Sequence, residues 1–270
     1  MAARMMRGAV SVFVVLVFML AGKAAVAACL LGMVQNQSLL HRAAWLADAA
    51  PKGTVRISFL GHSSFLIETP EGGTAVTDYN GVNVPAFTPD IVSMNNPHNT
   101  HFTDSPDPAI RFVLRGWKQG GGGLAKHDVR WKDLRVFNIP TNIGEYGDPR
   151  GNSSSIFVFE IANLCIAHLG HLHHVLTREQ LLALGRIDVL FVPIDGSSTM
   201  THEQALAVIR QIGPRLVIPM HFGFFGSADR FFELARTLWP VRAEKGSTIL
   251  VSRQTLPKST EVRFLQGSAF

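Results

Sequence analysis

The feature that most constrains this chain is the placement of its histidines, which follow three apolar runs typical of buried strands. The runs, each with the histidines that follow it, are Ile91–Met94 with His98 and His101, Ile156–Ile166 with His168, His171, His173 and His174, and Leu216–Met220 with His221. Imidazole is the commonest metal ligand in proteins and changes charge near neutral pH. Three strand ends that present histidines therefore predict one convergent site. A surface histidine tract at 168–174 is the alternative, but such tracts usually lie at chain termini.

The N-terminus carries the pattern of a secretory leader. Arg4 and Arg7 precede an apolar run, and Ala25-Val26-Ala27 provides the small residues of a cleavage site. The run has about ten residues, short of the roughly 20 that a membrane-spanning helix needs. Val26-Ala-Ala-Cys29 also resembles a lipoprotein box, which would leave Cys29 lipidated at the mature N-terminus. We therefore expect a leader over residues 1–28 and an exported protein, either periplasmic or anchored to the membrane as a lipoprotein.

The rest of the chain predicts an N-terminal helical segment over residues 29–52 and a single domain over residues 53–270. With 47% hydrophobic residues, the chain has ample material for a core. Early hairpins are followed by alternating helices and strands, which is typical of a layered α/β fold. Helices are expected over 178–184 and over roughly 202–212, because each begins at a Thr-x-x-Gln capping box.

The cysteines and the charge exclude some classes of site. Cys29 and Cys165 are the only cysteines and form no Cys-x-x-Cys motif, so a thiolate zinc site is excluded. The net charge is +5, with a local basic stretch at Arg111, Arg115, Lys118, Lys126, Arg130, Lys132 and Arg135. This stretch could attract an anionic substrate or lipid headgroups, or it could be a solvated face. No nucleic-acid-binding motif accompanies it, and we expect no nucleic-acid partner.

Five motifs occur in a defined order along the chain. They are Val55–Glu68 with Gly61-His62-Ser63-Ser64 inside it, Asp78, the box Asn96–His101, His168-Leu-Gly-His171, and Ile218-Pro-Met-His221. In kind and order these motifs resemble the metallo-β-lactamase superfamily, in particular the branch that contains ascorbate-6-phosphate lactonase. The resemblance implies an α/β fold, a four-layer αβ/βα sandwich, with a metal site at the sheet edge between its two halves. It also implies a zinc-dependent hydrolase.

The metal box departs from the superfamily pattern. Where that pattern reads His-x-His-x-Asp-His, this chain has Asn96, His98, Thr100 and His101. A further histidine expected near Ile143 is missing.

The last two ligand positions differ from each other. The bridging aspartate of the superfamily is His171 here, whereas the final histidine is retained as His221. A bridging carboxylate neutralises two cations at once, which neutral imidazole cannot do at comparable cost, so a two-metal site is poorly supported. The resemblance instead implies one ion at His101, His171 and His221, with His98 as a fourth ligand or a neighbour.

Other residues are expected around the metal rather than on it. Asp78 would orient a ligand histidine by a hydrogen bond, with an ordinary turn aspartate as the alternative. His62 is expected either at the edge of the site or in a satisfied turn. Its neighbour Ser63 is no hydrolase nucleophile, because Phe65 stands where the closing glycine of Gly-x-Ser-x-Gly is needed. The remaining residues expected near the site are Asn96, Thr100, His168 and His173.

We therefore expect an exported metal-dependent hydrolase that acts on a small ester, lactone or phosphoester through a metal-bound hydroxide. The cofactor is expected to be zinc, one ion per chain, although nitrogen ligands also suit copper or nickel. The substrate is a small molecule, which the basic stretch would allow to be anionic. The alternative is a non-catalytic metal- or ligand-binding module, because Thr100 replaces the aspartate that positions water in the superfamily. No residue is assigned as catalytic from the sequence.

Overall fold

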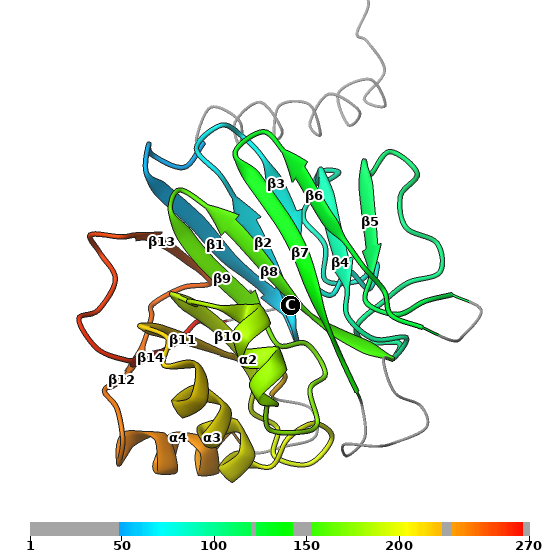
Figure 1. The fold of residues 1–270 in the computed structure, drawn as a ribbon. Coiled ribbons are helices and arrows are strands. Elements are labelled where there is room, and N and C mark those ends of the chain that lie inside the picture. The colour runs from blue at the N-terminus through cyan, green and yellow to red at the C-terminus, as the bar shows by residue number, and fades with distance from the viewer. Residues whose placement is uncertain (1–48, 120–122, 143–152, 223–227, 267–270) are drawn as a thin grey trace, which may run out of the picture. The chain divides into compact units, whose positions relative to one another are not determined.

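Two β-sheets pack against each other in this computed structural model, and each contributes side chains to the main core (Figure 1). The structure describes residues 49–119, 123–142, 153–222 and 228–266. The six-stranded sheet has the spatial order β13 (Thr248–Ser252), β1 (Thr54–Gly61), β2 (Ser64–Glu68), β3 (Thr74–Val76), β4 (Ile91–Met94) and β5 (Phe112–Arg115). The eight-stranded sheet has the order β12 (Val241–Ala243), β14 (Glu261–Phe264), β11 (Leu216–Met220), β10 (Val189–Pro193), β9 (Leu164–His168), β8 (Ser154–Ile161), β7 (Leu134–Thr141) and β6 (Asp128–Trp131).

In each sheet, parallel pairing brings the carboxyl ends of three neighbouring strands to one edge. In the eight-stranded sheet, β10 pairs in parallel with both β9 and β11. The connections between these strands contain the helices α2 (Arg178–Leu184) and α3 (His202–Ile212). Since parallel strands end at the same edge of a sheet, the segments after β9, β10 and β11 start side by side. In the other sheet, β4 pairs in parallel with β3 and β5 in the same way.

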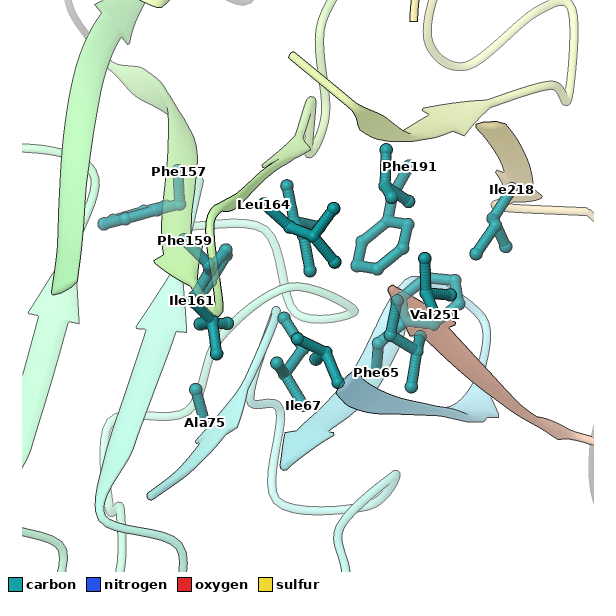
Figure 2. Close-up of a cluster of buried hydrophobic side chains, with 14 of the residues drawn as sticks. Phe65, Ile67, Ala75, Phe157, Phe159, Ile161, Leu164, Phe191, Ile218 and Val251 are labelled. Atoms are coloured by element: carbon teal, nitrogen blue, oxygen red, sulfur yellow. The ribbon is translucent and has the colours of Figure 1, made fainter. Parts of the chain in front are cut away.

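The core between the sheets follows from strand alternation. In β8 the side chains of Phe157 and Phe159 join the cluster shared by the two sheets, whereas Ile156 and Val158 join a second cluster. Successive side chains of a strand point to opposite faces, so this run is buried on both sides. The rings of Phe65 from β2 and Phe191 from β10 stack at 4.1 Å between centroids and so join the two sheets (Figure 2).

The three described helices, α2, α3 and α4 (Asp229–Arg236), lie over the eight-stranded sheet (Figure 1). Leu206 and Ile209 of α3 pack there with Val192 of β10. Over the outer face of the six-stranded sheet, the described residues form no helix. A smaller cluster, which includes Leu66, Tyr79, Val92, Ile110, Phe87 and Trp117, covers that face instead. The α/β sandwich prediction is confirmed.

Most elements expected from the sequence are present. Both Thr-x-x-Gln capping boxes form, at the N-termini of α2 and α3. The edge strands β6 and β12 were not expected, because they are only four and three residues long and largely exposed, which is too short for a reliable pattern. None of the helices within the described residues is long and apolar enough to cross a bilayer. The predicted leader lies outside the described residues, as does most of the segment 29–52, and the division at residue 53 stays a prediction.

Candidate metal centre

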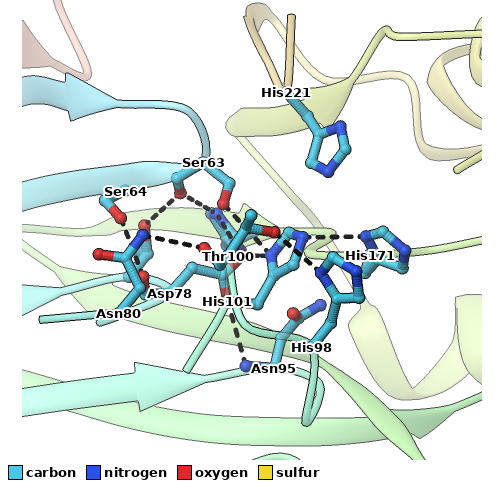
Figure 3. A network of polar contacts seen from close by, with 12 residues as sticks. Ser63, Ser64, Asp78, Asn80, Asn95, His98, Thr100, His101, His171 and His221 are labelled. Carbon is cyan, nitrogen blue, oxygen red and sulfur yellow. Dashed lines mark hydrogen bonds and ion pairs between the residues drawn. The ribbon is translucent and has the colours of Figure 1, made fainter. Parts of the chain in front are cut away.

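A buried carboxylate holds the histidine of the first strand end. His101 follows β4 and is fully buried, and its Nδ1 lies 2.5 Å from Oδ2 of Asp78 (Figure 3). Asp78 follows β3, and its Oδ1 accepts a hydrogen bond from the backbone N–H of Asn95 at 3.1 Å. Because Nδ1–H donates to the carboxylate, the lone pair of His101 is on Nε2. That nitrogen faces Nδ1 of His171 at 2.9 Å. Asp78 thus makes the contact to a histidine that the sequence predicted.

The second strand end delivers His171 beside His98. The chain passes the Asn95 side chain at Gly170, which has a φ of 59°, and a Cβ there would lie 1.3 Å from Nδ2 of Asn95. Only glycine therefore fits at position 170. The rings of His98 and His171 stack at 5.2 Å with an angle of 14° between their planes. His98 itself is exposed, and its Nδ1 hydrogen-bonds the hydroxyl of Thr100 at 3.0 Å.

A second carboxylate holds the histidine of the third strand end. His221 directly follows β11, and its Nδ1 lies 3.2 Å from Oδ1 of Asp195. Asp195 follows the neighbouring strand β10. Its Oδ2 accepts hydrogen bonds from the backbone N–H groups of Ser197, Ser198 and Thr199. The hydroxyl of Thr199 donates to the other oxygen. With Nδ1–H donating to this carboxylate, the lone pair of His221 is also on Nε2.

His62 approaches the same space from the turn between β1 and β2. Its ring centroid lies 4.1 Å from that of His221 and 5.5 Å from that of His101. The Nε2 atoms of His62 and His221 are both buried without a hydrogen-bond partner. Unsatisfied buried nitrogens are costly unless a ligand binds them. The residues present therefore fit a metal ion whose ligands are imidazole nitrogens.

The charge state of the cluster also suits metal binding. Burial and the neighbouring histidines lower the pKa of His62 to about 3 and that of His171 to about 2. The same causes hold the pKa of His101 well below its usual value. At neutral pH these imidazoles are uncharged, which is the form that binds a metal. Burial raises the pKa of Asp78 to about 6, although His168 and the Asn95 N–H act in the opposite direction.

The other residues predicted near the site serve the loops around it. His168 is fully buried and its Nε2 donates to the carbonyl oxygen of Ser63 at 2.8 Å, which braces the turn that carries His62. Asn96 is buried, and its amide donates to the Ser153 carbonyl at 3.4 Å. The ring of His173 is half-buried and lies 4.8 Å from that of His171.

The carbonyl oxygen of Thr100 accepts a hydrogen bond from Asn80 at 3.0 Å. The position near Ile143, where a further histidine was missing, lies outside the described residues.

Asp195 is the residue that the sequence analysis missed. It lies two residues after the buried strand β10, which ends at the same sheet edge as the strands before His171 and His221. The run Gly196-Ser197-Ser198 after it was a usable signal, because small polar residues after an aspartate favour a loop that wraps its carboxylate.

The chain belongs to the β-lactamase superfamily, since the family model described as a beta-lactamase superfamily domain matches residues 56–221. A UPF0173 protein of Pyrococcus abyssi is 38% identical over 194 residues, which cover 66% of this chain and 89% of that protein. A UPF0173 metal-dependent hydrolase of Ignicoccus hospitalis is 24% identical over 202 residues, covering 64% and 84%. A shorter match, 39% over 64 residues, covers 30% of a UPF0173 protein of Pyrococcus furiosus.

Solved structures agree with this membership. A Thermotoga maritima protein of the metallo-β-lactamase superfamily, described as a candidate Zn-dependent hydrolase, superposes with a TM-score of 0.58. It is 25% identical, and the match covers 78% of this chain and 100% of that protein. Igni18, a metallo hydrolase of Ignicoccus hospitalis, gives a TM-score of 0.54 at 20% identity, covering 74% and 99%. The superfamily prediction is confirmed, while the ascorbate-6-phosphate lactonase branch stays a prediction.

Proposed function

We propose that this protein is a metal-dependent hydrolase whose ion binds in the histidine cluster of His62, His98, His101, His171 and His221. The observation that carries the proposal is the convergence of ring nitrogens of His62, His101 and His221, with Nε2 of His62 and of His221 buried and without a hydrogen-bond partner. Relatives that bear the name metal-dependent hydrolase support it. Zinc, one ion per chain, is the cofactor we propose, because nitrogen ligands in a tetrahedral arrangement suit it. When bound, such an ion supplies Lewis acidity and lowers the pKa of water.

The chain's own residues would orient and shield this centre. Asp78 and Asp195 fix the rings of His101 and His221, so that Nε2 of each ring faces the cluster. His98 is the exposed imidazole of the cluster and borders its solvent side.

For the substrate we propose a small ester, lactone or phosphoester, with an anionic group favoured. The support is local charge. Arg115 ends β5 and pairs in register with Met94, the last residue of the strand that leads to His101. Arg115 therefore lies at the sheet edge where the strand before His101 ends, on the same face of the sheet as Met94. By contrast, Arg135 is engaged by Asp128 and Glu160 and is not available to a substrate.

The test combines metal content with hydrolysis. Protein purified without added metal is dialysed against a weak chelator and analysed for metals, then assayed with a nitrophenyl ester, a γ-lactone and a nitrophenyl phosphate. We expect close to one equivalent of zinc, and hydrolysis of one class that a strong chelator abolishes and zinc restores. Bound zinc without any hydrolysis would favour the non-catalytic module, which the threonine at position 100 already suggests. A folded protein that binds no metal would refute the proposal.

Export remains part of the proposal and rests on the pattern of residues 1–28. We propose that the mature protein is periplasmic or a membrane-anchored lipoprotein. Mass spectrometry of the native protein separates the cases: a mature N-terminus at Ala28 indicates the soluble form, and a diacylated Cys29 indicates the lipoprotein. An intact Met1 would contradict export.

A further inference from the structure

His62 differs from the other histidines of the cluster because it lies in the tight turn between β1 and β2 and was not among the ligands predicted from the sequence. Its backbone has a φ of 52°, and that of His221 has a φ of 56°. These left-handed conformations are uncommon for residues other than glycine and tend to persist where function requires them. The two residues are also joined directly, since the His221 N–H donates to the His62 carbonyl oxygen at 2.8 Å. The fold thus holds both backbones in the conformation that brings their rings together.

The positions of the ligand atoms separate His62 from His171. One ring nitrogen each of His62, His101 and His221 lie within 4.8 Å of one another. Within the described parts of the chain, no other group of three or more histidine, cysteine or acidic side chains meets this condition. Nitrogens bound to one tetrahedral zinc lie about 3.4 Å apart, given Zn–N distances of 2.0–2.1 Å. Binding an ion would therefore draw the three nitrogens closer together than they lie here.

His171 is placed differently. Its Nδ1 lies 2.9 Å from Nε2 of His101, yet it does not join the trio, so it lies beside one ligand nitrogen and farther from the others. The same ring stacks on His98 and lies near His173, on the more exposed side of the cluster. This is where an open fourth position of a catalytic metal would be expected, because such sites keep one position for water or substrate.

Resting on the metal-dependent function proposed above, we propose that His62, His101 and His221 are the three protein ligands of the ion and that His171 lines its open fourth position. The turn that carries His62 is built for this task. The Ser63 carbonyl accepts hydrogen bonds from both His168 and Thr77, and the Ser63 hydroxyl contacts Nδ1 of His101. These contacts hold the backbone of the turn that presents His62 to the cluster.

The experiment uses glycine variants of the two left-handed residues in the full chain. Glycine adopts a positive φ without strain, so His62→Gly and His221→Gly should fold, which circular dichroism checks. In both variants zinc affinity, measured by competition with a chromogenic chelator, should fall by about 100-fold or more, beyond the 10–100-fold typical of losing a supporting contact. Free imidazole added to His62→Gly should restore binding by filling the vacated space. His174→Gly, outside the cluster, should bind as the unaltered protein does.

His171→Ala is the decisive comparison. It should retain one equivalent of zinc with an affinity within about tenfold of the unaltered protein, and cobalt in place of zinc should show a shifted visible spectrum, because a neighbour of the fourth position is lost. Wild-type zinc affinity in His62→Gly together with lost binding in His171→Ala would overturn the assignment and leave the metal-dependent function standing. An unaltered protein that binds no zinc would overturn both.

Discussion

The two carboxylate–histidine pairs, Asp78 with His101 and Asp195 with His221, perform the same task in different surroundings. Each pair orients one imidazole at a strand end, with N–O distances of 2.5 Å and 3.2 Å. Asp78 is fully buried and receives one backbone N–H, that of Asn95, and burial raises its pKa. Burial acts in the same direction on Asp195, but hydrogen bonds from His221, Thr199 and the backbone outweigh it and lower its pKa.

The difference between the pairs shows that the orientation of the histidine and the charge of the carboxylate have separate physical causes. The loop after β10 stabilises the charge of Asp195 whether or not a metal is bound. The charge of Asp78 depends on its neighbours in the cluster, and a bound cation nearby would favour it. The first pair should therefore respond to metal, and the second should contribute to the stability of the metal-free protein.

The largest expected effect is the sensitivity of the metal-free protein to acid. Three cluster histidines, His62, His101 and His171, have pKa values lowered from 6.5, so the unfolded chain binds more protons than the folded one below that pH. Stability is then present above about pH 6.5 and lost on acidification, by about 2 kcal/mol for each histidine between pH 7 and pH 5. The raised pKa of Asp78 acts oppositely, by about 1 kcal/mol over the same interval.

Urea unfolding of the metal-free protein at the two pH values measures this effect. If the free energy of unfolding does not change between the two pH values, the folded protein accepts protons on the cluster histidines. The surroundings of Asp78 would then be less different from those of Asp195 than the structure indicates.

A smaller effect on stability should distinguish the Asp195→Asn variant from the Asp78→Asn variant. Asp195→Asn should lower the stability of the metal-free protein by about 1–3 kcal/mol, because an amide cannot accept all the hydrogen bonds that the carboxylate receives. Asp78→Asn should cost less than about 1 kcal/mol, because His101 and His171 can exchange tautomers and keep their hydrogen bonds while a buried charge is removed. Urea unfolding at pH 7.5 compares them. Equal losses would remove the distinction between the pairs.

Metal affinity should depend on both pairs, because each carboxylate orients one histidine of the cluster. In both Asp→Asn variants the amide favours the tautomer that protonates Nε2 of the partnered histidine, so zinc affinity should fall by about 10–100-fold, or about 1.4–2.7 kcal/mol. Chelator competition measures the zinc affinity. Asp133→Asn is the control, because the Asp133 carboxylate accepts a hydrogen bond from the Thr69 hydroxyl rather than from a histidine. If either variant keeps its affinity, that carboxylate does not orient a ligand.

The smallest effect tests the loop that wraps Asp195. Thr199→Val removes the hydroxyl that donates to this carboxylate but leaves three backbone donors and His221 in place. We expect a stability loss of about 1 kcal/mol and a change in zinc affinity of less than about threefold. A loss as large as that of Asp195→Asn would show that Thr199, rather than the backbone, holds the carboxylate.

The sequence by itself determined most of the strands and the histidines at the ends of three of them. The apolar runs of β4, β9 and β11, with histidines at or shortly after their ends, were sufficient, because a buried strand fixes where its polar successor emerges. Capping boxes determined where α2 and α3 begin, since those hydrogen bonds are local. The departures at Asn96, Thr100 and His171 were also visible without a structure.

Only the tertiary structure decided which side chains face one another. His62 lies 159 residues from His221 in the sequence, and their rings meet only because two strand turns take up left-handed conformations at the edge between the sheets. The sequence after Asp195 favours a loop that wraps its carboxylate, but its contact with His221 depends on the register of β10 beside β11. Periodicity reports which face and end of a strand a residue occupies. It does not report loop dihedrals or ring orientation, because these depend on packing between segments far apart in the chain.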